Sequence, residues 1–165
     1  MDLFIRSEQQ QSWLNKLQEK EDKFKNLSAQ IDEQGIFPKE NIEDLVHLGY
    51  TKITLPKEFG GEGLNVYDMV LFQETLASYD SNTALSIGWH LGTVGEIYEK
   101  KAWTPENLDF LAKEILNGAV VNRSVSEAQT GSPTRGGRPG TNAVKIENGW
   151  VLKMEEKHLQ QLRPS

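Results

Sequence analysis

The 165-residue sequence has no cysteine and no long run of apolar residues. Without cysteine the chain can form no disulfide bond, no thiolate metal site and no cysteine nucleophile, which is compatible with a reducing cytoplasm. No apolar run approaches the length of a membrane-spanning helix, so we expect a soluble protein with no membrane contact. Residues 1–6 are too short an apolar stretch for a signal peptide. We therefore expect a cytoplasmic protein.

Histidine is also scarce, and the 18 basic residues are outnumbered by 24 acidic ones. The three histidines do not form a His-Glu-x-x-His arrangement, so the sequence predicts no metal site. No Gly-x-Ser-x-Gly motif marks a nucleophile elbow. The net charge of −6 argues against nucleic acid as a main partner, because phosphate contact favours a basic surface.

Helical patterns dominate the first two thirds of the sequence. Apolar residues recur at spacings of three and four over residues 7–34, which predicts one amphipathic helix. A shorter helix is expected over residues 38–49, followed by an extended stretch over residues 50–55. Asn65 is a candidate cap for the next helix. Residues 82–100 are apolar around much of a helical circumference and are expected to form the central helix.

The pattern changes from helical to β near residue 119. Thr104 and Pro105 are typical of a helix start, and we expect the buried stripe of that helix to be Leu108, Phe110, Leu111 and Ile115. Residues 119–126 are predicted to form a strand. Residues 141–146 alternate with a period of two, and the pair Asn148 and Gly149 predicts a hairpin into residues 150–152.

Two glycine-containing segments are the candidate functional motifs. The glycines at 60, 61 and 63 suggest a phosphate cradle, but no Gly-Lys-Ser/Thr follows them, and a simple turn is the alternative. Residues 123–132 are typical of a strand that opens into a Gly/Ser turn. Backbone N–H groups and hydroxyls there can meet a planar or phosphorylated ligand, whereas the alternative is an ordinary strand edge.

Together the two segments resemble the N-terminal part of the acyl-CoA dehydrogenase family of flavoproteins. Residues 56–63 are similar to the family's Pro-x-x-x-Gly-Gly-x-Gly segment, and the helix after them carries Gln73 and Glu74 as the family's does. Residues 81–90 resemble the helix that helps to wall the acyl pocket. Residues 126–127 and 131–132 match a Thr-Glu-x-x-x-Gly-Ser pattern, which follows a strand whose backbone lies along the flavin ring.

The resemblance implies a set of binding residues. FAD would contact Arg123, Ser124, Val125, Ser126, Gly131 and Ser132, with Val125 and Ser126 against the isoalloxazine ring. Ser132 would also bind phosphate or the acyl-CoA chain, and His90 would lie at the substrate end. A lone histidine in an apolar helix is more often a satisfied core residue. Arg135 and Arg138 suit an anionic tail, with a solvated loop as the alternative.

The same resemblance implies the architecture. The fold would be mainly α, with residues 1–118 as the N-terminal helical domain of the acyl-CoA dehydrogenase fold and residues 119–152 as the start of an incomplete middle β domain. In the family the catalytic base is a glutamate in a C-terminal domain. We therefore expect no catalytic residue within this chain.

The implied activity is the α,β-dehydrogenation of an acyl-CoA thioester in fatty acid metabolism, with FAD as cofactor. The implied partners are acyl-CoA, an electron-transfer flavoprotein or another acceptor, and further copies of the same chain. Residues 128–130 and Pro133 depart from the family pattern. These departures leave the identity of the thioester substrate open, and they are also compatible with reduced-flavin monooxygenases of the same fold. A helical interaction module without catalysis is the alternative from another class.

The resemblance stops after Leu152. A family member would continue Asn-Gly-Arg/Lys-Lys-Thr-Phe-Thr, but residues 153–165 do not. The genetic code allows a shifted reading frame in which each new codon begins at the third base of the present one, from Lys153 onward. This frame encodes Asn or Asp, then necessarily Gly, then Arg or Gly, Lys or Glu, and Thr or Ala. With ordinary codon choices it continues Phe-Thr-Thr. We therefore expect residues 153–165 to be frame-shifted and the chain to be a truncated, inactive gene product. A natural divergent tail is the alternative.

Overall fold

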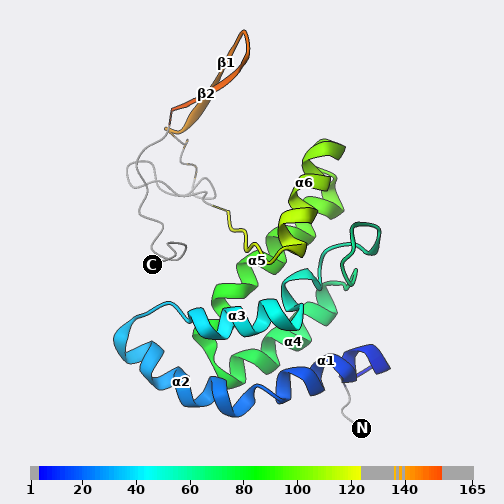
Figure 1. Ribbon diagram of the computed structural model, residues 1–165, viewed down its shortest axis with the longest axis vertical. Helices are drawn as coiled ribbons and strands as arrows, with labels where there is room; N and C mark the ends of the chain where they lie inside the picture. The colour runs from blue at the N-terminus through cyan, green and yellow to red at the C-terminus, as the bar shows by residue number, and fades with distance from the viewer. Residues whose placement is uncertain (1–3, 124–135, 137, 139, 154–165) are drawn as a thin grey trace. The chain divides into compact units, whose positions relative to one another are not determined.

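A computed structural model describes residues 4–123, 136, 138 and 140–153. The chain divides into two compact units, residues 1–122 and residues 123–165. The first unit is helical and the second contains a β-hairpin (Figure 1). The expected fold class, a mainly α N-terminal helical domain followed by the start of a β region, is confirmed. Among the residues that the structure describes, no helix is both long and apolar enough to cross a membrane.

The first predicted helix is in fact two helices. α1 spans Glu8–Gln18 and α2 spans Glu21–Gln34, and they meet at an angle (Figure 1). The single helix expected over residues 7–34 is therefore wrong. Residues 18–23 are all polar, so no apolar side chain holds the helix to the core between Leu17 and Phe24. The break lets α1 pack on α4 while α2 contacts both α4 and α5.

Short 3₁₀ turns replace the extended stretch expected over residues 50–55. α3 spans Lys39–Leu48, η1 spans Tyr50–Lys52 and η2 spans Lys57–Phe59. Gly49 ends α3 in the left-handed conformation (φ 82°), where glycine is favoured. The turn buries Tyr50, Thr51 and Ile53 together, whereas an extended segment would direct Tyr50 to the side opposite to the other two.

The next two helices form the middle of the helical unit. α4 spans Val66–Tyr79 and α5 spans Ser81–Lys100. Asn65 caps α4 as predicted, and its capping box is completed by Asp68. α5 contacts α2, α3, α4 and η1. It is therefore the central helix, as expected from its apolar sequence.

α6 is the last helix of this unit and spans Pro105–Leu116, with Thr104 as the predicted cap. Its buried residues are Leu108, Leu111, Ala112 and Ile115. Phe110 is 63% exposed, so its expected place in the buried stripe is wrong. Each residue advances about 100° around a helix, which puts position 110 far from the face shared by positions 108, 111 and 115.

The buried apolar side chains form two clusters. The larger contains Trp13, Leu17, Phe24, Ile42, Leu45, Tyr50, Ile53, Phe72, Leu76, Ala84, Ile87 and Leu91. The smaller contains Leu55, Val94, Ile97, Tyr98, Leu108, Leu111, Ala112 and Ile115. After α6 the chain stays on this core, because Val120 packs against the larger cluster and Val121 against the smaller one.

The second unit contains the predicted hairpin. β1 spans Asn142–Ile146 and β2 spans Gly149–Lys153, and they pair antiparallel with Ile146 opposite Gly149. The hairpin is confirmed, although its turn residues are 147 and 148. The strand expected over residues 119–126 is wrong for residues 119–123, which form no strand. Residues 124–126 lie outside the described residues.

Candidate functional site

Three of the predicted binding residues fall within the described part of the chain. His90 lies on α5, and Arg123 and Arg138 are exposed and outside any helix or strand. The others, Ser124, Val125, Ser126, Gly131, Ser132 and Arg135, lie outside the described residues, and their roles stay predictions. Within the described ranges, no group of three His, Cys, Asp or Glu side chains is placed to hold a metal ion.

His90 is fully buried, and both of its ring nitrogens have backbone partners. Nδ1 accepts the N–H of Val121 at 3.0 Å, and Nε2 lies 2.7 Å from the carbonyl oxygen of Thr51. Because Nδ1 accepts, the proton is on Nε2, which donates to Thr51, and the ring is the neutral tautomer. Burial lowers the pKa of His90, and the two backbone hydrogen bonds oppose that shift. This is the geometry of a satisfied core histidine, while its predicted contact with substrate stays a prediction.

The glycine-rich loop uses its backbone N–H groups internally. The N–H groups of residues 60, 61 and 63 donate to the carbonyls of Lys57, Pro56 and Leu55, at 3.0, 3.1 and 2.8 Å. Donors that already bind the chain's own carbonyls are not aimed at a phosphate. Gly60 and Gly63 have positive φ values of 87° and 62°, which a turn of this shape requires. The loop geometry therefore supports the turn interpretation.

An open groove of about 590 Å³ runs between α4 and α5. Its apolar lining includes Met69, Val70, Ala77, Ala84, Leu85 and Trp89. Val70, Leu85 and Trp89 are 53%, 62% and 57% exposed, so large apolar side chains gather on this surface. The apolar residues of α5 outside its core stripe line this groove. They form a second apolar face of α5, which the helical unit does not cover.

Gln73 crosses the floor of the groove in a fixed position. Its amide oxygen accepts the hydroxyl of Tyr50 at 3.0 Å, and its amide nitrogen donates to the carbonyl of Ala84 at 2.9 Å. A Cβ at Gly88 would lie 2.5 Å from that nitrogen. Glycine at position 88 therefore lets Gln73 lie across α5, and the polar atoms of Gln73 are satisfied within the protein.

A second hollow of about 450 Å³ lies between the glycine-rich loop and the second half of α5. Its lining includes Thr54, Leu64, Met69, Leu91, Gly92 and Gly95. Met69 thus lines both hollows. The Thr54 hydroxyl donates to the carbonyl of Leu91 at 2.9 Å, so this polar side chain of the wall is satisfied within the protein.

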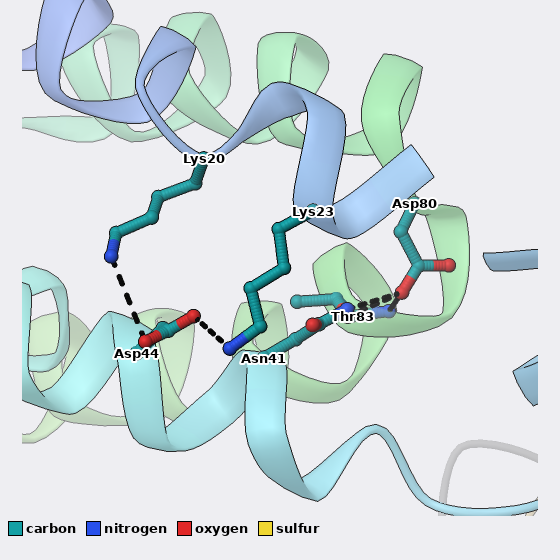
Figure 2. A network of polar contacts seen from close by, with 6 residues as sticks. All are labelled: Lys20, Lys23, Asn41, Asp44, Asp80 and Thr83. Carbon is teal, nitrogen blue, oxygen red and sulfur yellow. Dashed lines mark hydrogen bonds and ion pairs between the residues drawn. The ribbon is translucent and has the colours of Figure 1, made fainter. Parts of the chain in front are cut away.

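A buried polar network ties three helices together at the start of α5. The Asp80 carboxylate, 1% exposed, accepts hydrogen bonds from Asn41 on α3 and Thr83 on α5 (Figure 2). The hydroxyl of Ser28 on α2 donates to the same carboxylate. The carboxylate also accepts the N–H groups of residues 82 and 83, so it caps α5. The network therefore fixes the first turn of α5, at one end of the groove. The sequence pattern gave no sign of the partners of Asp80 on α2 and α3.

A more exposed ion-pair group joins the same region. Lys20 and Lys23 lie 3.6 and 2.6 Å from the carboxylate of Asp44 on α3 (Figure 2). Partial burial raises the pKa of Asp44, but the hydrogen bond from Lys23 and the two ammonium charges outweigh it and leave the pKa lowered. Such partly exposed pairs contribute little to stability.

The chain resembles known proteins over most of its length. Residues 7–103 match the family described as Acyl-CoA dehydrogenase, N-terminal domain. A Bacillus subtilis (strain 168) protein named "Putative acyl-CoA dehydrogenase YdbM" is 53% identical over 152 residues, 92% of this chain and 40% of that protein. A 3-sulfinopropanoyl-CoA desulfinase from Variovorax paradoxus is 32% identical over 136 residues, 78% of this chain and 34% of that protein.

A third relative, the cyclohexane-1-carbonyl-CoA dehydrogenase of Syntrophus aciditrophicus (strain SB), is 31% identical over 133 residues, 79% of this chain and 34% of that protein. The chain therefore spans about a third to two fifths of the length of these relatives. The matched residues include α1 to α5, which form the groove and hold His90 and Asp80. On these similarities the chain belongs to the acyl-CoA dehydrogenase family.

Proposed function

We propose that this chain is the N-terminal part of an FAD-dependent oxidoreductase that dehydrogenates an acyl-CoA thioester, and that its helical unit supplies one wall of the acyl-binding pocket. The groove between α4 and α5 carries the proposal. Its volume of about 590 Å³ lies within the roughly 300–1,000 Å³ of small-molecule sites. Apart from Gln73, Glu74 and Ser81 the lining is apolar, and such a wall suits an alkyl chain.

The fixed amide of Gln73 strengthens the assignment to an acyl chain. A buried amide without partners would favour a polar ligand, because unpaired polar groups are costly to bury. Here Tyr50 and Ala84 already satisfy that amide. The groove therefore presents Val70, Leu85 and Trp89 to its occupant, and these contacts are driven by burial of apolar surface.

The donor chemistry of residues 123–132 fits FAD. Ser126 and Ser132 carry hydroxyls, and Gly131 has no side chain to obstruct its backbone N–H. We propose that this segment binds FAD, with Val125 and Ser126 at the flavin ring and Ser132 at phosphate or the acyl-CoA chain. The other proposed FAD contacts are Arg123, Ser124 and Gly131. Neutral donors of this kind bind ring edges and phosphate oxygens. Bound FAD would supply the hydride acceptor.

Other parts of the proposal concern the whole protein. The base that removes the substrate proton would come from sequence outside this chain. An electron-transfer flavoprotein or another acceptor would reoxidise the flavin, and the assembly would be a homo-oligomer in the cytoplasm. We propose that residues 153–165 are frame-shifted, which sequencing of the gene around codon 153 tests. An in-frame template with a natural stop after codon 165, and no homologous frame downstream, would contradict this.

A chimera tests the proposed function. Residues 1–152 of this chain replace the equivalent residues of the full-length Bacillus subtilis relative, which is 53% identical to it. We expect the chimera to bind FAD and to oxidise acyl-CoA with a dye as electron acceptor, at rates comparable to those of the relative. The 165-residue chain alone serves as the control and is expected to be inactive. A folded, FAD-bound chimera that oxidises no acyl-CoA, beside an active relative, would contradict the proposal.

A reduced-flavin monooxygenase is the second candidate, because residues 128–130 and Pro133 depart from the dehydrogenase pattern. The same chimera separates the two activities. A dehydrogenase reduces the dye without oxygen. A monooxygenase consumes oxygen only when reduced flavin is supplied, and leaves the dye unchanged with acyl-CoA alone.

A further inference from the structure

We propose that His90 is a positioning residue that fixes where the chain leaves the helical unit and enters residues 123–132. The inference rests on the proposed function, which makes that segment the flavin-binding one. His90 would act on FAD through the backbone, by holding Val121 two positions before Arg123.

The segment after α6 is held by side chains of the helical core. Residues 119–123 form no helix or strand, so no regular ladder within them fixes the backbone. The N–H of Val121 is held by Nδ1 of His90, and the side chains of Val120 and Val121 pack against the two core clusters. These contacts thus anchor the end of the helical unit at Val121.

The other edge of the same ring holds a distant segment. Nε2 donates to the carbonyl of Thr51, a residue that is 2% exposed and lies in η1. The two partners of His90 are 39 and 31 positions away along the chain. One buried ring on α5 therefore holds two segments in place. The first is η1, which leads into the glycine-rich loop, and the second is Val121, which precedes the proposed flavin segment.

The contacts require the chemistry of a neutral imidazole. One edge of the ring must accept from an N–H while the other donates to a carbonyl, and a neutral imidazole does both on a rigid frame. Asparagine can place an acceptor near the position of Nδ1. Glutamine can place a donor near the position of Nε2. These two variants therefore separate the Val121 contact from the Thr51 contact.

Amide hydrogen exchange in the 165-residue chain tests the contact. We expect the Val121 amide to be protected in the wild type and to exchange about tenfold faster in His90→Gln, the factor expected for one lost buried hydrogen bond. His90→Asn should keep protection close to wild type, while amides in the middle of α4 report whether each variant is folded. An unprotected Val121 amide in the wild type overturns the proposal, as does equal exchange in the two folded variants. The wild-type result and the ring's nitrogen chemical shifts, which should show the Nε2–H tautomer, decide the geometry even if a variant fails to fold.

FAD binding in the chimera tests the positioning role. We expect the dissociation constant for FAD to rise in His90→Gln and to stay near that of the parent chimera in His90→Asn. Equal FAD affinity in both, beside the expected exchange difference, overturns the positioning role. If the parent chimera binds no FAD, the proposed function fails, whereas the exchange experiment still decides whether His90 holds Val121.

Discussion

Replacing Gly61 by alanine tests the close approach that forms the glycine-rich loop. A Cβ at position 61 would lie 2.0 Å from the carbonyl oxygen of Leu55 and 2.5 Å from its carbonyl carbon. These are backbone atoms of a residue that is fully buried, so the clash cannot be relieved by turning a side chain. The loop must move, and that movement strains the hydrogen bond from Gly63 to the same carbonyl, 2.8 Å long.

The expected cost combines two terms. Overpacking with a backbone shift costs about 1–3 kcal/mol, and loss of one hydrogen bond costs about 1 kcal/mol more. We expect Gly61→Ala to lower the free energy of unfolding by about 2–4 kcal/mol, a large share of the roughly 5–15 kcal/mol typical of a domain. Urea denaturation followed by far-UV circular dichroism measures this change.

Gly92→Ala is the matched control for this experiment. Gly92 lies inside α5, and a Cβ there would meet no atom within 4 Å. Alanine in a helix interior is favoured over glycine by about 0.5–1 kcal/mol, so this variant should be more stable than wild type. A Gly61→Ala protein with the same urea midpoint as wild type, or two variants that shift in the same direction, would refute the reasoning.

Three further predictions follow from the buried groups and the groove. Asp80→Ala should cost about 3–5 kcal/mol, because it removes a cap and leaves buried donors unpaired, whereas Asp44→Ala should cost less than about 1 kcal/mol; urea denaturation compares them. Burial holds the pKa of His90 below its ordinary 6.5, so the unfolded chain binds the proton first, and stability should fall as the pH drops below about 6.5. His90→Asn should flatten that slope, and an unchanged slope would contradict it. In the chimera, Trp89→Ala should raise KM for acyl-CoA. Phe110→Ala removes a similarly exposed aromatic side chain from α6 and should not raise KM, and equal effects would contradict the proposed acyl-binding wall.

Local chemistry allowed several elements to be predicted from the sequence. Asn65 and Thr104 begin helices because their side chains accept the first free N–H groups, and this requires only neighbouring residues. The hairpin from residue 142 to residue 153 was also predictable, because alternating residues flank a turn signal. Such features depend on a few consecutive positions and not on the rest of the fold.

Features that depend on tertiary packing could not be predicted. The break at residues 19–20 contains no glycine or proline, and it lets α2 contact α5 as well as α4, whereas α1 packs on α4. The hydrogen bonds of Asp80 to Ser28 and Asn41 join residues 52 and 39 positions apart. A sequence pattern carries no signal for contacts at such separations.

The candidate site divides in the same way. The motif at residues 123–132 was found by resemblance, and most of it lies outside the described residues. The groove was missed because it forms only when α4 and α5 pair. Its one signal was the apolar character of Leu85 and Trp89, which lie outside the core stripe of α5. Both partners of His90 are backbone groups, so their identity could not be read from side-chain types.

The flavin spectrum of the chimera under anaerobic conditions tests the central claim most directly. If residues 1–152 form the acyl-binding wall and flavin segment of a dehydrogenase, adding acyl-CoA without any other reductant should bleach the oxidised flavin absorbance as hydride is transferred. The Bacillus subtilis relative provides the reference spectrum. An FAD-loaded, folded chimera whose absorbance stays unchanged with acyl-CoA substrates that bleach the relative would contradict the account.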